Sequence, residues 1–370
     1  MATIVERTTA SPATHALIIG VNDYPHLAGG VKADATILST LKQLTSPVPS
    51  ASLFANWLLD EKASLAVPFG SARVLLSGGK FVRSDNSETT VDTPTFGNIK
   101  RHFNDWIEAC NEHKNCVALF YFCGHGFINE SSYILPEDVC SDKNTPWEDC
   151  IDLNATHKGM ARCRAETQCF FIDACQDLAR QALLTTGPVG RTLASPEKGF
   201  TPKREAPVYH SAAEGQRAAS QKNLPSDFTV GLIECLKRYG ASANDGRNPW
   251  RVTTTSLGRA LEEYLDRRGQ GEAPVLALNM ESTAGTKRIC SIKEPEVLTN
   301  VDLGQALDEV DSCIFTDRRD GAEHPVCHPY RHAFAVGDYD IKIHMKNSPV
   351  RTKEEERLVP PVYPVEVPDV

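Results

Sequence analysis

The chain has 370 residues, of which 41% are hydrophobic and 24% charged, enough for a soluble protein with a sizeable core. This length suits one large domain with an appendage, or two domains. The formal net charge of −9 argues against nucleic acid as a main partner, because phosphate binding needs clustered Lys and Arg. The same charge gives no attraction to an anionic membrane, so we expect neither partner.

The apolar runs His15–Gly20 and Cys116–Cys123 are too short to cross a bilayer. The N-terminus has no basic flank followed by an apolar stretch of secretory length, so we read no signal peptide and expect a cytoplasmic protein. The twelve cysteines form no CxxC pair of the kind that builds a structural zinc site. Several fall in apolar runs, where a reduced cysteine behaves as a small hydrophobe, so most are expected to be packing residues rather than metal ligands.

The first 300 residues alternate between short apolar runs and amphipathic stretches, which predicts an α/β fold: a mostly parallel six-stranded sheet flanked by helices. The six strands are expected at His15–Val21, Ser71–Ser77, Cys116–Cys123, Gln168–Ala174, Pro207–Ala213 and Ala273–Met280. Helices are expected at Asp34–Leu44, Thr95–Cys110, Asp227–Arg238 and Leu257–Arg268. The polar stretch Gly78–Pro94 is expected to be a mobile loop.

Two further stretches differ in composition. The segment between Arg180 and Pro207 is rich in Gly, Pro, Ser, Thr and basic residues and predicts a long exposed loop. Beyond Pro295 we expect a small β-containing extension, with a helix at Val301–Cys313, a strand pair over His332–Lys346 and an extended tail.

Two predicted strands end in chemically unusual residues. The third ends at Cys123, followed by Gly124-His125-Gly126, and the fourth runs through Asp173 to Cys175. The carboxyl ends of parallel strands meet at one edge of a sheet, so His125 and Cys175 can face one another. An imidazole can take the thiol proton and later give it to a leaving amine, which makes Cys175 a candidate nucleophile and His125 its general base.

The residues around this pair fit the same chemistry. The backbone N–H groups of Gly126 and Cys175 are candidates for an oxyanion hole. Each feature also has a bland explanation, since Gly-His-Gly is often a surface turn and a cysteine at a strand end is often a core residue. Both features at the ends of successive strands favour catalysis.

The sequence resembles the caspase family of cysteine proteases, and especially its metacaspase-like bacterial branch. The resemblance rests on HALIIGVNDY, FYFCGHG, YILPEDV, CFFIDACQD, SAAEGQRA and DFTVGLIECL, and it covers about Thr14 to Met280. The 50-residue spacing between the histidine and the cysteine is also typical of caspases. The resemblance implies a caspase-like fold, a His125–Cys175 dyad with no obligatory third member, and a role in bacterial defence or cell death.

The resemblance also bears on specificity. Caspases that cut after aspartate carry Gln-Ala-Cys, whereas Asp173 lies at the position where metacaspases place an acid that receives Arg or Lys. Cleavage after Arg or Lys is therefore expected, although Asp173 could instead cap the next helix. Asp34 is the nearest candidate for a second pocket acid, and Cys123 replaces the usual serine. Substrate contacts are expected at Ser211, Ala212 and Ala213, where the substrate would add to a strand edge, although small residues there could equally be packing.

The predicted organisation has an N-terminal extension (1–13), a caspase-like catalytic domain (14–294) and a C-terminal extension of unknown role (295–370). The catalytic domain comprises a large part (14–180), an exposed processing loop (181–206) and a small part (207–294). Because this loop is basic, we expect a zymogen that is processed by itself or by an upstream activating protease. The candidate cleavage positions are Arg180, Arg191, Lys203 and Arg204. An inert loop is the alternative.

No cofactor is expected, and the resemblance leaves calcium dependence open. The expected partner is a protein substrate. Two other classes remain as alternatives. A protease-like fold could act as a catalytically silent interaction module, and LSGGK (Leu76–Lys80) could indicate a nucleotide site, although it lacks the phosphate-loop spacing.

Overall fold

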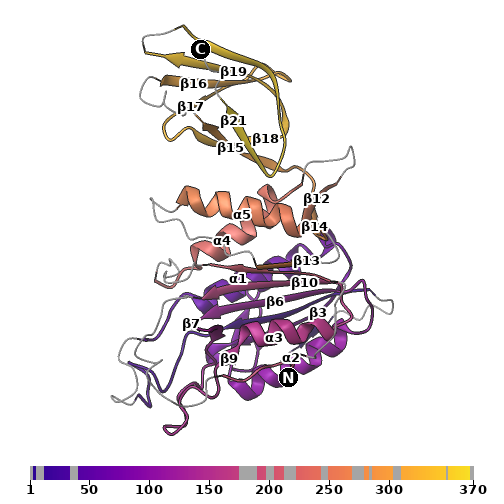
Figure 1. Ribbon diagram of the computed structural model, residues 1–370, viewed down its shortest axis with the longest axis vertical. Coiled ribbons are helices and arrows are strands. Elements are labelled where there is room, and N and C mark those ends of the chain that lie inside the picture. The colour runs from indigo at the N-terminus through magenta and orange to yellow at the C-terminus, as the bar shows by residue number, and fades with distance from the viewer. Residues whose placement is uncertain are drawn as a thin grey trace. The chain divides into compact units, whose positions relative to one another are not determined.

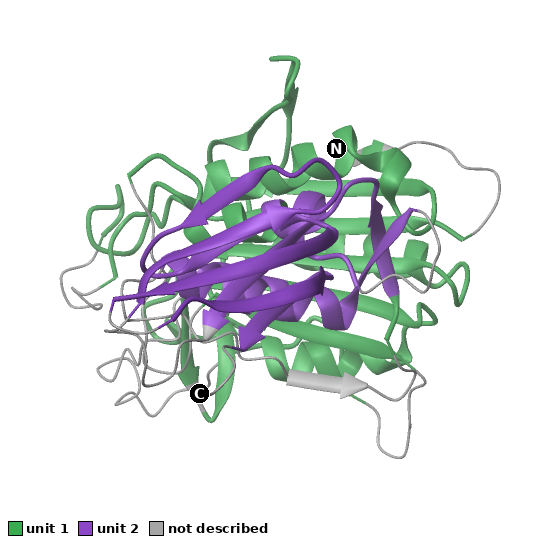
Figure 2. Ribbon diagram, turned by 90° about the horizontal axis from the view of Figure 1, so that it is seen from above, with its two compact units in different colours: residues 1–233, 274–287 green, residues 234–273, 288–370 purple. Residues whose placement is uncertain are grey.

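The computed structural model describes residues 3–5, 12–33, 41–174, 190–196, 204–211, 222–242, 249–268, 279–282, 286–302, 310–346 and 349–366. By their internal contacts they form two compact units, drawn in separate colours in Figure 2. The first comprises residues 1–233 and 274–287, and the second residues 234–273 and 288–370. The functional boundary expected at residue 295 stays a prediction.

A seven-stranded sheet forms the centre of the first unit (Figure 1), in the order β1-β3-β2-β6-β10-β11-β13. Its inner five strands, β3 to β11 in that order, are parallel, while β1 and β13 pair antiparallel at the two edges. The strands are β1 (Thr3–Val5), β2 (Thr14–Gly20), β3 (Phe69–Leu76), β6 (Val117–Gly124), β10 (Thr167–Ala174), β11 (Glu205–His210) and β13 (Asn279–Ser282). The predicted α/β fold is confirmed, and β1 adds one strand to the six expected.

Helices cover both faces of this sheet. The strands β2, β6, β10 and β11 are therefore buried along their whole length, as is typical of parallel strands. Successive side chains of a strand point to opposite faces. Helix α1 (Pro47–Asp60) covers one face, where Phe54 stacks on Tyr121 with centroids 4.7 Å apart. Helix α2 (Phe96–Cys110) covers the other, where Trp106 lies against Phe120. The described part of the first unit also contains the α-helices α3 (Leu153–Gly159) and α4 (Asp227–Glu234).

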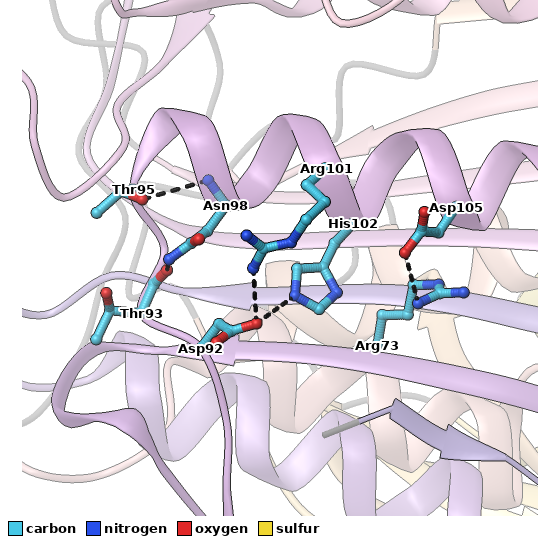
Figure 3. Close-up of polar contacts among 8 residues, drawn as sticks. All are labelled: Arg73, Asp92, Thr93, Thr95, Asn98, Arg101, His102 and Asp105. Atoms are coloured by element: carbon cyan, nitrogen blue, oxygen red, sulfur yellow. Dashed lines mark hydrogen bonds and ion pairs between the residues drawn. The ribbon is translucent and has the colours of Figure 1, made fainter. Parts of the chain in front are cut away.

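Helix α2 is fixed to its surroundings by a group of polar contacts at its first turns (Figure 3). The Thr95 hydroxyl caps the helix by accepting from the Asn98 N–H at 3.3 Å. The Asp92 carboxylate accepts from Arg101 at 2.9 Å and lies 2.7 Å from Nε2 of the buried His102. The His102 hydrogen bond is the largest influence that lowers the pKa of Asp92. These contacts hold the loop before α2 onto the helix. The helix predicted over Thr95–Cys110 is confirmed, and its first residue is Phe96.

Two local predictions in the first unit are wrong. Leu41–Leu44 is not helical, and the first helix starts at Pro47, where proline is well tolerated because no N–H is needed. Residues 34–40 lie outside the described part. The expected loop over Gly78–Pro94 contains the hairpin β4 (Lys80–Val82) and β5 (Glu88–Thr90). A small sheet, β7 (Gly126–Asn129), β8 (Ser131–Ile134) and β9 (Ile151–Asp152), follows β6.

The second unit contains α5 (Thr254–Arg268), a π-helix (Cys235–Tyr239) that continues from α4, and the pair β12 (Trp250–Thr253) and β14 (Arg288–Ile292). Two further sheets share one apolar core that includes Val297, Phe315, Phe334 and Ile341. Their orders are β18-β15-β21 and β17-β16-β19-β20. The strands are β15 (Glu296–Asp302), β16 (Val310–Asp317), β17 (Glu323–Val326), β18 (Arg331–Ala335), β19 (Gly337–Met345), β20 (Arg351–Leu358) and β21 (Val362–Glu366).

The C-terminal extension is therefore β-containing, as expected, but one element was predicted wrongly. The described ends of the helix predicted over Val301–Cys313 are strands, since residues 301–302 belong to β15 and residues 310–313 to β16, whose alternate side chains enter the shared core, and residues 303–309 lie outside the described part. The predicted pair over His332–Lys346 consists of two strands in different sheets, since β18 pairs with β15 and β19 pairs with β16. Across the described residues, no helix has both the length and the hydropathy needed to traverse a bilayer.

Candidate active site

The carboxyl ends of β6 and β10 lie side by side at one edge of the sheet. In the parallel pair, Cys123 is opposite Asp173 and Gly124 is opposite Ala174. His125 follows directly after β6. Cys175 lies outside the described residues, so the geometry of the site is given by His125, Asp173 and their neighbours.

His125 is held by contacts to both its ring and its backbone. Its ring nitrogen Nε2 lies 2.6 Å from the carbonyl oxygen of Lys42, which can only accept, so Nε2 carries the proton. The backbone N–H of His125 donates to the Tyr24 hydroxyl at 2.7 Å, and this hydroxyl donates to the Leu135 carbonyl at 3.4 Å. The neutral ring therefore has its lone pair on Nδ1, the nitrogen available to act as a base.

The surroundings of His125 also set its charge. The side chain is 8% exposed, and this burial lowers the pKa of His125 from its ordinary value, while the Lys42 carbonyl opposes the shift. A lowered pKa keeps the imidazole neutral at pH 7, as a general base requires.

Gly124 permits this arrangement because it has no side chain. A Cβ at this position would lie 2.7 Å from the Tyr24 hydroxyl oxygen, the group that holds the His125 backbone. The first glycine of the Gly-His-Gly motif is therefore required by a close approach, which was not foreseen from the sequence.

The carboxylate of Asp173 is 2% exposed and accepts hydrogen bonds from uncharged groups. The Ser226 hydroxyl donates to Oδ2, as do the Thr229 hydroxyl at 2.8 Å and the Cys123 thiol at 3.3 Å. Burial is the largest influence on the pKa of Asp173 and raises it, and the hydrogen bonds oppose this rise. Burial and the nearby Asp173 also raise the pKa of Cys123, so its thiol stays protonated and donates.

The alternative role of Asp173 as a cap of the next helix falls on residues 175–189, which lie outside the described part. The cap of α4 is Ser226, whose hydroxyl oxygen accepts from the Thr229 N–H at 3.1 Å at the start of that helix. Ser226 and Thr229 thereby connect α4 to the end of β10 through Asp173. A signal for this cap is present in the sequence, since Ser226 precedes the predicted helix, but there is none for the contact between Ser226 and Asp173.

His125 and Asp173 both line a pocket of about 300 Å³. Asp173 is the one carboxylate among the described residues that line it. Its described lining is Gln43, Leu44, Thr45, Ser46, Pro47, Cys123, Gly124, His125, Asp173, Lys222 and Ser226. The segments 43–47 and 222–226 form its walls and are joined by the Asn223 N–H, which donates to the Thr45 hydroxyl at 3.1 Å.

Of the other predicted site residues, the structure describes Ser211 and Gly126. Ser211 follows β11, where its N–H donates to the Ile172 carbonyl at 3.0 Å and its hydroxyl to the Ala174 carbonyl at 3.4 Å. Gly126 is buried and pairs with Ile134 as the first residue of β7. Asp34, Ala212 and Ala213 lie outside the described residues.

Two of the four candidate processing positions have extensive contacts. The Arg191 side chain pairs with Glu148 and with Asp149 at 3.3 Å, and its carbonyl accepts from the Asp152 N–H. Arg204 is 2% exposed and donates to Gln168 at 2.8 Å and to the His157 carbonyl at 3.0 Å.

A protease could not reach the buried Arg204 without local opening, contrary to the expected exposure of the whole loop, whereas the paired Arg191 is exposed. Arg180 and Lys203 lie outside the described residues.

Several residues of the site escaped the sequence analysis. They are Tyr24, the Lys42 carbonyl, Gln43, Ser226 and Thr229. A backbone carbonyl has no sequence signal, because every residue carries one. No three His, Cys, Asp or Glu side chains of the described ranges are grouped as a metal site.

The sequence of the chain is similar to that of known proteins. Residues 13–271 match the family model described as the caspase domain. An uncharacterized protein of Sinorhizobium fredii is 22% identical over 201 residues, which is 54% of this chain and 58% of the relative, so the match spans little more than half of that protein.

Two solved structures are also similar to the chain. A structural-genomics protein of Geobacter sulfurreducens has 13% identity and a TM-score of 0.45 over 74% of this chain and 94% of the other. Caspase-1 of Spodoptera frugiperda has 12% identity and a TM-score of 0.41 over 78% and 96%. The family match, which covers more than half of the sequence, is the finding that decides: this chain belongs to the caspase-domain family of peptidases.

Proposed function

We propose that the protein is a cysteine endopeptidase that cleaves after Arg or Lys, with Cys175 as nucleophile and His125 as general base. The family, whose members are generally cysteine peptidases, supports the reaction class. The observation that carries the proposal is the pocket in which the His125 ring and the buried carboxylate of Asp173 lie together. Because Gly124 pairs with Ala174, the chain positions that follow them leave neighbouring strands at the same edge.

In the proposed reaction, Nδ1 of His125 takes the Cys175 thiol proton, because Nε2 is engaged with the Lys42 carbonyl. The thiolate attacks the scissile carbonyl carbon, and the N–H groups of Gly126 and Cys175 receive the oxyanion. The C–N bond then breaks as the imidazolium gives its proton to the leaving amine. Water hydrolyses the thioester, with His125 taking a proton from the water and the thiol being restored.

Asp173 is proposed to select the residue before the scissile bond. The hydrogen-bond partners of Asp173 among the described residues are uncharged, and burial of the carboxylate raises its pKa. An arginine or lysine side chain entering the pocket would pair with this carboxylate, in a pocket that Lys222 also lines. Three donors converge on Oδ2 and the Ser211 side chain is a fourth hydrogen-bond partner of the carboxylate, so we propose that the substrate cation binds alongside these uncharged groups.

A panel of peptides that differ only at the residue before the scissile bond tests this specificity. The Asp173→Asn variant keeps the shape and loses the charge, so cleavage after Arg should fall about 10- to 100-fold, the value of a charge-assisted hydrogen bond. Asp105→Asn is the matched control, because Asp105 pairs with Arg73 and does not line the pocket. A wild-type preference for Asp would overturn the assignment.

A thiol-reactive probe separates an enzyme from a silent interaction module. Selective labelling of Cys175, lost in His125→Ala, is expected of the enzyme. Absence of both labelling and peptide turnover would favour the module.

We also propose processing between the large and small catalytic parts, at Arg180, Arg191 or Lys203. Burial makes Arg204 a poor target in the folded chain, whereas Arg191 is exposed, although its side chain is paired with Glu148. Wild type and Cys175→Ala should be incubated with and without a trypsin-like protease, and new N-termini sequenced. Full activity of an uncut chain would contradict the zymogen proposal.

The proposed setting is the cytoplasm, with a protein substrate and a role in bacterial defence or cell death, and it rests on the family resemblance. Induced expression in a bacterial host provides a test. Growth arrest by wild type and not by Cys175→Ala would support the role. Equal growth of the two strains, with the wild-type enzyme active in lysates, would count against it.

A further inference from the structure

The short segment Leu41–Leu44 is fixed by one half-buried side chain, that of Gln43. Its amide oxygen accepts from the Tyr24 N–H at 2.7 Å. Its amide NH₂ group donates to the carbonyl of Tyr24 at 3.0 Å and to that of Ala28 at 3.1 Å. A single amide therefore uses its acceptor and both of its donors on the turn that follows β2.

The backbone reinforces this attachment on both sides of Gln43. The Leu44 N–H donates to the Asn22 carbonyl at 2.9 Å, and the Ala28 N–H donates to the Leu41 carbonyl at 3.2 Å. Lys42 forms a β-bridge with Ala28. The segment is thus aligned along residues 22–28, with the Gln43 side chain at its centre.

Gln43 joins the segment Leu41–Leu44 to the turn over residues 22–28, and each of these two pieces supplies one of the groups that hold His125. The Lys42 carbonyl, which fixes Nε2, precedes Gln43 in the chain. The Tyr24 hydroxyl, which fixes the His125 backbone, belongs to the residue whose N–H and carbonyl both bond to the Gln43 amide. A shift of the segment relative to the turn would therefore alter the direction of the His125 ring.

We propose that Gln43 is a positioning residue for catalysis: it holds Lys42 and Tyr24 so that Nδ1 of His125 is directed toward the nucleophile. This inference rests on the proposed function, and it extends that function to a residue whose described hydrogen bonds go to Tyr24 and Ala28. The larger expected effect is on proton transfer, because the hydrogen bonds to Asp173 come from residues other than Gln43, and the smaller one is on binding, because Gln43 itself lines the pocket.

Three substitutions test the amide. Gln43→Met keeps length and volume and removes all three hydrogen bonds. Gln43→Glu keeps the acceptor and replaces two donors by a carboxylate that repels the carbonyls. Gln43→Ala removes the side chain. In each variant kcat should fall about 10- to 100-fold, as expected when a general base is misaligned, with KM changed less than threefold.

The matched control is Asn56→Ala, which removes an amide that donates to the Val82 carbonyl at 3.2 Å. Its kcat should equal that of wild type. Circular dichroism gives the folded fraction of every variant, and rates are compared per folded molecule.

A spectroscopic measurement distinguishes positioning from general destabilisation. The His125 Nε2–H, hydrogen-bonded to the Lys42 carbonyl, should give a slowly exchanging downfield proton resonance. The resonance should be assigned through its loss in His125→Ala. It should exchange faster in Gln43→Met and Gln43→Glu and remain in Asn56→Ala.

The outcomes separate this inference from the proposed function. If wild type neither cleaves peptides nor reacts selectively at Cys175, the proposed function fails. If wild type does both, and Gln43→Met keeps its kcat and the slow resonance, the proposed function stands and the positioning role of Gln43 is refuted.

Discussion

A buried histidine at the end of β11 should make the protein sensitive to mild acid. His210 is 7% exposed, and no hydrogen-bond partner for its Nδ1 occurs in the described part of the chain. Burial, and to a smaller extent the neighbouring His157 on α3, together lower the pKa of His210 to about 4. Replacing His210 by Phe removes the titrating group and keeps a ring in the same place.

The size of the effect follows from the two pKa values of His210. In the unfolded chain the ordinary value is about 6.5, so between pH 6.5 and about 4 the unfolded state binds the extra proton. Stability is therefore fully present above pH 6.5 and is lost as the pH falls toward 4. The complete loss is about 3 kcal/mol, of which about 2 kcal/mol has occurred at pH 5.

Urea unfolding at pH 7 and pH 5, followed by tryptophan fluorescence, measures this loss. Three of the four tryptophans, Trp57, Trp106 and Trp147, belong to the first unit, so the signal reports mainly on the unit that contains His210. The decrease in the free energy of unfolding from pH 7 to pH 5 should be about 2 kcal/mol smaller in His210→Phe than in wild type.

His328→Phe, at an exposed position, serves as the control and should keep the wild-type pH dependence. An equal decrease in wild type and His210→Phe would refute the reasoning, because the lost stability would then come from other groups. A destabilised variant with an unchanged slope would show that the ring packs there without taking part in the pH response.

Three other substitutions probe the site and its support. Gly124→Ala should reduce kcat at least tenfold with a small change in Tm, because the new Cβ would displace the Tyr24 hydroxyl from His125; wild-type kinetics would contradict this contact. Thr95→Ala should lower the free energy of unfolding by about 1 kcal/mol, measured in urea, through loss of the α2 cap, and Thr95→Ser should restore most of it. Phe54→Ala should cost about 3–5 kcal/mol in the same assay, and a cost below about 1 kcal/mol would mean that α1 does not depend on this ring.

The elements that could be predicted were those whose side chains repeat with a clear period. β2, β6 and β10 appear in the sequence as continuous apolar runs because both of their faces are buried, and α2 appears through apolar residues at helical spacing. The short polar hairpin β4–β5 has no such pattern. The strands β15 and β16 were mistaken for a helix because their apolar residues suit either period over a short stretch.

The candidate site divides in the same way. The sequence alone indicated His125, Asp173 and the strand ends that carry them, since a reactive side chain directly after a buried strand is visible in the order of residues. The partners of those side chains were not visible. The Lys42 carbonyl meets His125 across 83 positions of the chain, and Ser226 meets Asp173 across 53.

The sequence by itself therefore determined the family, the order of the main strands and the proposed chemistry, because these depend on residue type and local periodicity. Only the tertiary structure decided which nitrogen of His125 is free to act as a base, what surrounds the Asp173 carboxylate and how Gln43 supports both Tyr24 and Lys42. These features arise from backbone carbonyls and uncharged hydroxyls, groups so common in any sequence that folding alone selects the ones that matter.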